Sequence, residues 1–230
     1  MLPNLGPRLS LIASMVPKGA KVCDVGTDHG LLPAYLFLLG NTSSVFATDI
    51  ADRPLARAAE CIKRYGADGV RLILCDGLDG VGKDDVDTVI IAGMGGEVIS
   101  GIIERCAFSK SGSVTFILQP MTGADELRRY LAEKGFDVVR ETAVCEHRKV
   151  QSVMLVRFVG TVRDIDETEA LIGRVTADTR EGVAYIKKQF DRCIKCANSL
   201  KNVPDRQAEY DRWNTAAQNL NKLLEAQYGI

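Results

Sequence analysis

The sequence predicts an α/β protein: a doubly wound parallel sheet with an antiparallel last strand, followed by a helical C-terminal domain. Short apolar, β-branched runs that end in Asp or Gly alternate with amphipathic stretches along the first 160 residues. From Val162 onward no strand pattern occurs, and apolar residues recur three and four positions apart instead. We therefore expect two domains, residues 1–160 and 161–230.

Five strands and five helices are expected in the first part of the chain. The strand candidates are Lys21–Val25, Val45–Asp49, Val70–Cys75, Thr88–Ala92 and Val114–Leu118. The helix candidates are Arg8–Met15, Leu31–Leu39, Arg53–Tyr65, Glu97–Cys106 and Ala124–Lys134. Most of these strands are separated by a helix, which is typical of parallel strands with helices covering both faces.

The end of the sheet follows a different pattern. Phe136–Thr142 and Val150–Val159 are both strand candidates, and no helix lies between them. A hairpin-like antiparallel edge, connected by residues 145–149, is therefore expected to close the sheet. Beyond it, two long amphipathic helices that fold back at Asn202–Pro204 would form an antiparallel coiled-coil pair. This near-neutral pair fits either a packing or dimerising hairpin or an arm that grips a substrate.

Composition limits the possible partners. The 230 residues include 29 Lys and Arg against 30 Asp and Glu, which excludes a polycationic nucleic-acid wrapper and leaves any RNA contact to a local patch. Seven cysteines lie mostly in apolar runs and are expected to be reduced thiols. No uninterrupted apolar span of about 18 residues and no signal-like start are present, so we expect a cytoplasmic protein without a membrane partner. Cys193 and Cys196 lack a second ligand pair, so no metal site is expected.

The densest chemical signal follows the first strand, at Asp24–Gly30. In an open α/β sheet, ligands bind beyond the carboxyl ends of the strands, and glycines there let the backbone approach the ligand. Asp49 ends the second strand, where a carboxylate can accept both hydroxyl protons of a ribose. Asp76 and Gly77 end the third, where an acid and an amide can read an adenine edge. Each Asp alone could instead be a helix cap or a turn former.

The sign of the charge discriminates between two nucleotide cofactors. A dinucleotide fingerprint has Gly-x-Gly-x-x-Gly beside a pyrophosphate, but here Asp28 replaces the middle glycine and would repel phosphate. S-adenosylmethionine has no phosphate and carries a cationic sulfonium and an ammonium group, so the pattern favours this methyl donor over NAD. The expected cofactor-binding residues are Asp24, Gly26, Thr27, Asp28, Gly30, Asp49, Ile50, Asp76, Gly77, Ala92, Gly93 and Met94.

The fourth and fifth strands lead into candidate acceptor-binding residues. Ala92–Gly96 has almost no side-chain bulk, which leaves room for a flat acceptor, although it could simply form a tight turn. Gln119 ends the fifth strand with an amide that could fix the acceptor or the cofactor's tail, or could be a polar cap. The expected substrate contacts are Arg8, Gly95, Gly96 and Pro120.

These motifs resemble a known family, the bacterial tRNA (adenine-22-N1)-methyltransferases called TrmK. The resemblance rests on Arg8–Pro17, D-V-G-T-D-H-G at Asp24–Gly30, I-A-G-M-G-G at Ile91–Gly96 and L-Q-P at Leu118–Pro120, and it covers nearly the whole chain. It implies a Rossmann-like methyltransferase domain that binds S-adenosylmethionine and a helical domain that helps to cradle tRNA. The chain departs from the family pattern at Met121 and at Gln151–Ser152.

Methyl transfer depends mostly on holding donor and nucleophile in line, so little covalent help is needed. Adenine N1 becomes cationic on methylation, and a carboxylate would stabilise that charge. The expected catalytic residues are Asp28, then His29, and Gln119. Candidate RNA-contacting cations are Arg8, Arg53, Arg57, Lys63, Arg64, Arg128, Arg129, Arg148 and Lys149. Two alternatives stay open: a methyltransferase with another RNA, protein or small-molecule acceptor, and a non-catalytic RNA-binding or coiled-coil protein. A monomer or weak homodimer is expected.

Overall fold

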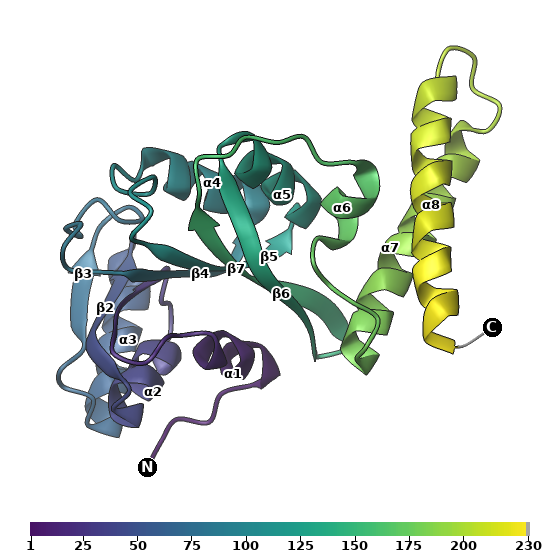
Figure 1. Cartoon of the computed structure of the whole chain (residues 1–230). Coiled ribbons are helices and arrows are strands. Elements are labelled where there is room, and N and C mark those ends of the chain that lie inside the picture. The colour runs from purple at the N-terminus through teal and green to yellow at the C-terminus, as the bar shows by residue number, and fades with distance from the viewer. Residues whose placement is uncertain (229–230) are drawn as a thin grey trace.

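A single seven-stranded sheet forms the centre of the protein, in the order β3-β2-β1-β4-β5-β7-β6 (Figure 1). The computed structural model describes residues 1–228. The strands are β1 (Ala20–Val25), β2 (Thr42–Asp49), β3 (Arg71–Leu74), β4 (Thr88–Gly95), β5 (Thr115–Thr122), β6 (Phe136–Glu146) and β7 (Lys149–Phe158). The helices are α1 (Pro7–Ser14), α2 (Leu31–Leu39), α3 (Asp52–Tyr65), α4 (Gly96–Arg105), α5 (Ala124–Glu133), α6 (Glu167–Ile172), α7 (Arg180–Leu200) and α8 (Gln207–Tyr228).

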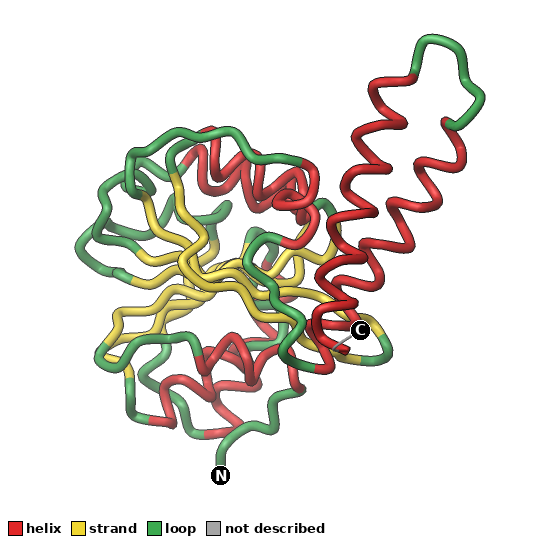
Figure 2. Tube along the Cα trace, turned by 45° about the vertical axis from the view of Figure 1, so that its right-hand side comes forward, coloured by secondary structure: helices red, strands yellow, loops and turns green. Residues whose placement is uncertain are grey.

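The predicted doubly wound arrangement is confirmed. Strands β1 to β5 pair in parallel, and helices lie on both sides of the sheet (Figure 2). Ile12, Leu36 and Ile62, from α1, α2 and α3, belong to one buried cluster, whereas Ile99 of α4 and Leu127 of α5 belong to another. Strand order reverses between β1 and β4, and such a reversal opens a crevice beyond the carboxyl ends of the strands.

The antiparallel edge is also confirmed, but its turn is tighter than expected. β7 pairs antiparallel with both β5 and β6, and the β6–β7 connection is only His147 and Arg148, with φ of 48° and 64°. Two left-handed residues are typical of a two-residue hairpin that matches the strand twist. β4 and β5 also run further than predicted, because their pairing continues to Gly95 and Thr122.

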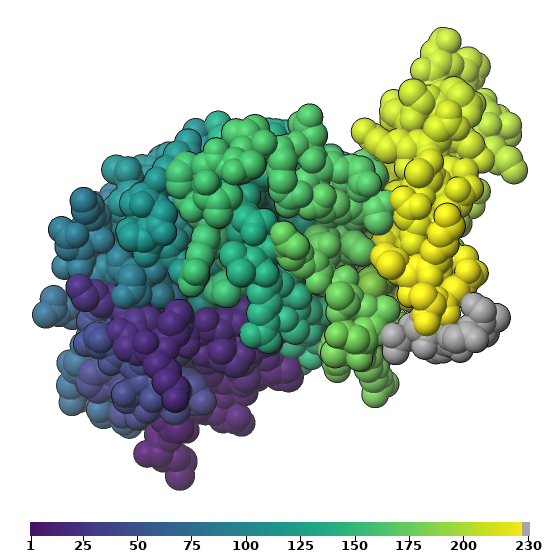
Figure 3. Space-filling view, viewed as in Figure 1, coloured from purple at the N-terminus to yellow at the C-terminus, as the bar shows by residue number. Residues whose placement is uncertain are grey.

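The C-terminal segment contains three helices where two were expected. The first predicted helix is broken: the Asp166 side chain caps α6, which ends at Ile172 before Gly173, and Thr179 caps a separate α7. α7 and α8 then pack along each other, and the tip of the pair stands clear of the sheet domain (Figure 3). The loop between them spans residues 201–206, which agrees with the predicted reversal.

A buried ion pair fastens these helices to the sheet domain. Arg128 of α5, only 3% exposed, donates to Glu141 of β6 at 2.6 Å and to the Tyr185 hydroxyl of α7 at 2.8 Å. The same guanidinium also donates to the carbonyl oxygens of Ala170 and Leu171 in α6. The expectation that Arg128 contacts RNA is therefore wrong, because none of its charge reaches the surface.

Candidate cofactor and substrate site

The carboxyl ends of β1, β2 and β3 meet around a cavity of about 720 Å³, which we call the Asp49 cavity. The strand register brings these ends together, since Val25 pairs with Thr48 and Asp49 with Leu74. Six predicted cofactor-binding residues line it: Gly26, Asp49, Ile50, Asp76, Gly77 and Met94. The walls also include residues that the sequence did not single out: Val25, Thr48, Glu97, Val98, Gly101, Ile102 and Arg105.

A second cavity of about 270 Å³, the Asp24 cavity, adjoins the first, and Gly26 lines both. The predicted residues along it are Arg8, Asp24, Gly26, Thr27, Asp28, His29, Ala92 and Gly93. Leu9, Leu31 and Leu32 complete the wall. The two cavities therefore gather most of the predicted cofactor set at the crevice between β1 and β4.

Gly26 sits where the backbone must pass closest to the cavities. Its φ is +72°, and a Cβ there would lie 2.1 Å from Cε of Met94. Gly30 has a packing role that the sequence did not predict. A Cβ on Gly30 would lie 2.8 Å from Cα of Ala58, so this glycine permits the close approach of α2 and α3, and it lines neither cavity.

The wall of the Asp24 cavity holds a buried carboxyl and a buried hydroxyl. Asp24 is 5% exposed, and its burial raises the pKa of the carboxyl to about 6. Within residues 1–228, Thr27 Oγ1 is a buried side-chain atom without a hydrogen-bond partner. Burying a hydroxyl without a partner costs stability, so the place of Thr27 in the cavity wall, beside the Asp24 carboxyl, indicates a polar ligand.

Two acids beside the cavities, Asp49 and Asp28, already form hydrogen bonds or ion pairs within the protein. The Asp49 carboxylate accepts the backbone N–H of Ala51 at 3.0 Å and that of Asp28 at 3.4 Å. Asp28, in a left-handed conformation with φ of 45°, forms an ion pair with Arg57 and lies 3.2 Å from His29 Nε2. Each carboxylate oxygen has two lone-pair sites, so Asp49 keeps acceptor capacity for a ligand.

Gln119 lies outside both cavities and is fully buried. Its Oε1 accepts from Arg8 Nη1 at 2.9 Å and from the Gly93 N–H at 3.1 Å, and its Nε2 donates to the Pro120 carbonyl at 3.0 Å. The amide therefore fastens α1 and the β4 turn to the sheet. This position fits the alternative of a satisfied polar group better than a catalytic contact.

The remaining predicted substrate residues are divided between two other hollows. Gly95 and Gly96 line one of about 450 Å³, and Pro120 lines a pocket beside α7. A Cβ on Gly96 would lie 2.2 Å from the Gly123 carbonyl oxygen, so the close approach of two turns requires this glycine. Among residues 1–228, no cluster of three metal-ligating side chains was found, and no helix there has the length and apolarity to cross a membrane.

Comparisons with known proteins agree with this geometry. Residues 5–154 match the model of a family described as "Methyltransferase domain". The tRNA (adenine(22)-N(1))-methyltransferase of Bacillus subtilis is 32% identical over 153 residues, which span 66% of this chain and 64% of that protein. The residues of α4 that line the Asp49 cavity were not predicted, because the sequence at the start of this helix contains no motif that distinguishes it from other helices.

Solved structures extend the likeness to the C-terminal helices. A Streptococcus pneumoniae protein in complex with S-adenosyl-L-methionine is 27% identical, with a TM-score of 0.76 over 94% of this chain and 98% of that one. The Bacillus subtilis m1A22 tRNA methyltransferase TrmK, 23% identical, has the same fold, with a TM-score of 0.81 over 96% of this chain and 99% of its own. With its doubly wound sheet, its paired cavities and a family match across two thirds of its length, the chain belongs to the methyltransferase-domain family.

Proposed function

We propose that this protein is an S-adenosylmethionine-dependent methyltransferase that methylates N1 of adenine 22 in tRNA. The observation that carries the proposal is the buried Asp24 and the unpartnered Thr27 hydroxyl in the Asp24 cavity, directly beside the Asp49 cavity. A carboxylate and a hydroxyl suit a ligand that brings an ammonium group rather than a diphosphate. The tRNA target is supported by the Bacillus subtilis relative.

The residues present fit this cofactor in two halves. In the Asp49 cavity, Asp49 would accept the ribose hydroxyls, and Asp76 with Gly77 would meet the adenine edge. In the Asp24 cavity, Asp24 and Thr27 would bind the amino-acid end, with the Arg8 guanidinium available for its carboxylate. Gly26 lines both cavities, and a side chain there would push Met94, which lines the Asp49 cavity.

The bound cofactor supplies an electrophilic methyl group. The chain's own task is then to hold the adenine in line with it and to exclude water, since positioning provides most of the rate enhancement. Asp28 and His29 lie on the wall of the Asp24 cavity, where a negative charge would stabilise the cation that forms on N1. Arg57 orients the Asp28 carboxylate in this arrangement.

A tRNA substrate also defines the setting of the protein. We propose that it acts in the cytoplasm on tRNA, with no membrane partner, as a monomer or weak homodimer. We also propose a methyltransferase domain over residues 1–160 and a helical domain over residues 161–230. Its C-terminal helices then serve the RNA rather than a second protein.

The test uses two tRNA transcripts that differ only at position 22. The full-length protein, the unmodified transcript and methyl-labelled S-adenosylmethionine should yield 1-methyladenosine, identified by mass spectrometry of the nucleosides. A transcript with guanine at position 22 should remain unlabelled. Equal labelling of both transcripts would refute the assigned position, and labelling of neither would refute the proposed activity.

A further inference from the structure

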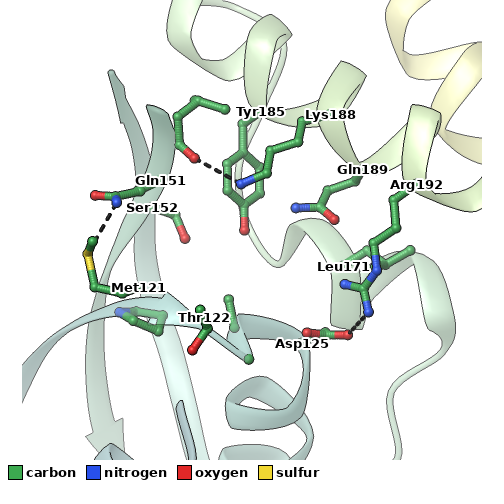
Figure 4. Close-up of a pocket in the computed structure, with 14 residues that line it drawn as sticks. Met121, Thr122, Asp125, Gln151, Ser152, Leu171, Tyr185, Lys188, Gln189 and Arg192 are labelled. Atoms are coloured by element: carbon green, nitrogen blue, oxygen red, sulfur yellow. Dashed lines mark hydrogen bonds and ion pairs between the residues drawn. The ribbon is translucent and has the colours of Figure 1, made fainter. Parts of the chain in front are cut away.

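A separate pocket lies between the β5–α5 turn, β7 and α7 (Figure 4). Its volume is about 150 Å³, which corresponds to about five water molecules at about 30 Å³ each and is the size of one small heterocycle. One wall, with Thr122 and Asp125, belongs to the sheet domain, and the opposite wall, with Tyr185 and Gln189, belongs to α7.

Gln189 is the most informative residue of this pocket. It is 8% exposed, yet its amide forms no hydrogen bond with any residue in the described range 1–228. Figure 4 shows the amide directed into the pocket from α7. The amide therefore meets the pocket with a donor and an acceptor that no group in the described range occupies, which suits a ligand with a polar edge.

Two hydroxyl groups that line the pocket, one from β7 and one from α7, add donors. Tyr185 Oη and Ser152 Oγ both accept from Nη2 of Arg128, at 2.8 Å and 3.3 Å. Because an oxygen that accepts from Arg128 keeps its own O–H, both hydroxyls can still donate to a ligand. The pocket therefore presents donors and an acceptor to a flat polar group, which is how proteins read an unstacked base.

The rim of the pocket carries two cations and one acid. Arg192 forms an ion pair with Asp125 at 3.0 Å and its Cζ lies 5.6 Å from the ring centroid of Trp213, yet its side chain is 46% exposed. Lys188 donates to the Val150 carbonyl at 3.2 Å. Asp125 offsets one positive charge, so the rim keeps one in excess, with N–H groups free to contact a phosphate.

A series of shared wall residues connects the pocket with the proposed cofactor site. The neighbouring hollow of about 450 Å³ shares Thr122, Asp125 and Arg192 with the pocket. At its other end it shares Glu97 and Val98 with the Asp49 cavity. A polynucleotide could therefore run along one surface from the cofactor site to α7.

We propose that this pocket binds the base of a second, unpaired tRNA nucleotide, while the adenine to be methylated enters the cofactor site. Gln189 contacts the polar edge of that base, with the Ser152 and Tyr185 hydroxyls beside it. Arg192 and Lys188 contact the adjoining phosphate. The inference rests on the proposed function, since tRNA is its ligand, and it makes α7 a wall of the RNA site.

The test compares Gln189→Met with Gln218→Met, which makes the same change at an exposed position of α8. Binding of a fluorescently labelled, unmodified tRNA transcript is measured by anisotropy with S-adenosylhomocysteine present. We expect Gln189→Met to raise the Kd for tRNA about three- to tenfold, the loss of one or two neutral hydrogen bonds. Its melting temperature and its Kd for S-adenosylhomocysteine should stay unchanged, because Gln189 bonds to nothing in the free protein. Gln218→Met should match the wild type.

A second variant, Gln189→Glu, keeps the shape and adds a negative charge, so it should weaken tRNA binding further. Wild-type affinity in both Gln189 variants would overturn the inference. If the wild type binds tRNA without methylating it, the proposed activity fails, and the binding comparison still decides the inference. If the wild type binds no tRNA, both are refuted.

Discussion

Replacing Arg128 with Met should destabilise the protein severely. Arg128 and Glu141 form a pair whose side chains are 3% and 0% exposed, and the guanidinium also bonds to α6 and α7. Met fills a similar volume but leaves the Glu141 carboxylate buried without its counter-ion. Removing one member of a buried ion pair typically costs about 3–5 kcal/mol, against a total stability of about 5–15 kcal/mol.

Thermal unfolding measures this loss directly. For a chain of about this size, each kcal/mol lowers the melting temperature by about 2–4 °C, so a fall of about 6–20 °C is expected. The double variant Arg128→Met with Glu141→Leu removes both charges and should recover at least half of the loss. Arg206→Met, which breaks an exposed pair with Glu209 in α8, should leave the melting temperature unchanged. A fall of less than about 2 °C for Arg128→Met, or no recovery in the double variant, would show that this pair does not hold the helices in place.

Three further changes test the cofactor site. Gly26→Ala should weaken donor binding in calorimetry, because its Cβ would push the Cε of Met94, 2.1 Å away, within a shared cavity wall, whereas Gly40→Ala, at a similar φ with open space around it, should only lower the melting temperature. The pKa of Asp24 is raised to about 6, so its ionised form dominates above pH 6. The Kd for S-adenosylmethionine should therefore not change with pH above pH 6, and it should rise by up to about tenfold for each pH unit below pH 6. Asp24→Asn should remove this pH step; a wild-type Kd that is flat to pH 5 would contradict the assignment. Gln119→Leu should lower the melting temperature by about 2–12 °C, since Arg8 and the Gly93 N–H lose their acceptor, and an unchanged value would reject its positioning role.

Apolar periodicity predicted most of the fold, because the apolar residues that each helix or strand buries recur along the sequence with the period of that element. α2 begins and ends where its spacing predicted, at Leu31 and Leu39. The tight β6–β7 turn carried a weaker signal, because His147 and Arg148 are not the Asn-Gly or Asp-Gly pair that marks a two-residue hairpin turn in a sequence. The break before α7 did have a local signal in the capping Thr179, but a continuing apolar spacing masked it.

The candidate site was predictable where function depends on strand ends. Asp24, Asp49 and Asp76 follow parallel strands, and the carboxyl ends of such strands meet at one edge. Packing between distant segments was not predictable from the sequence. Gly30 and Gly96 resemble ligand-binding glycines in the sequence, but Ala58 and Gly123 are the neighbours that require them, and no local pattern reveals such neighbours.

The attachment of α7 favours one of the two interpretations of the C-terminal helices, an arm that grips the substrate, over a hairpin that only packs or dimerises. A hairpin that serves only to pack or dimerise needs an apolar face, and the pairing of α7 with α8 already supplies one. Such a hairpin does not need a buried arginine that bonds to four other elements, as Arg128 does. Burying a charge is costly, and its best-attested benefit is that it specifies one geometry. Here that geometry fixes Tyr185 of α7 opposite Ser152 of β7. A fixed distance between this wall and the methyl donor is what an RNA-gripping arm requires, since a nucleic acid can be positioned only by contacts that do not move relative to the reacting atoms.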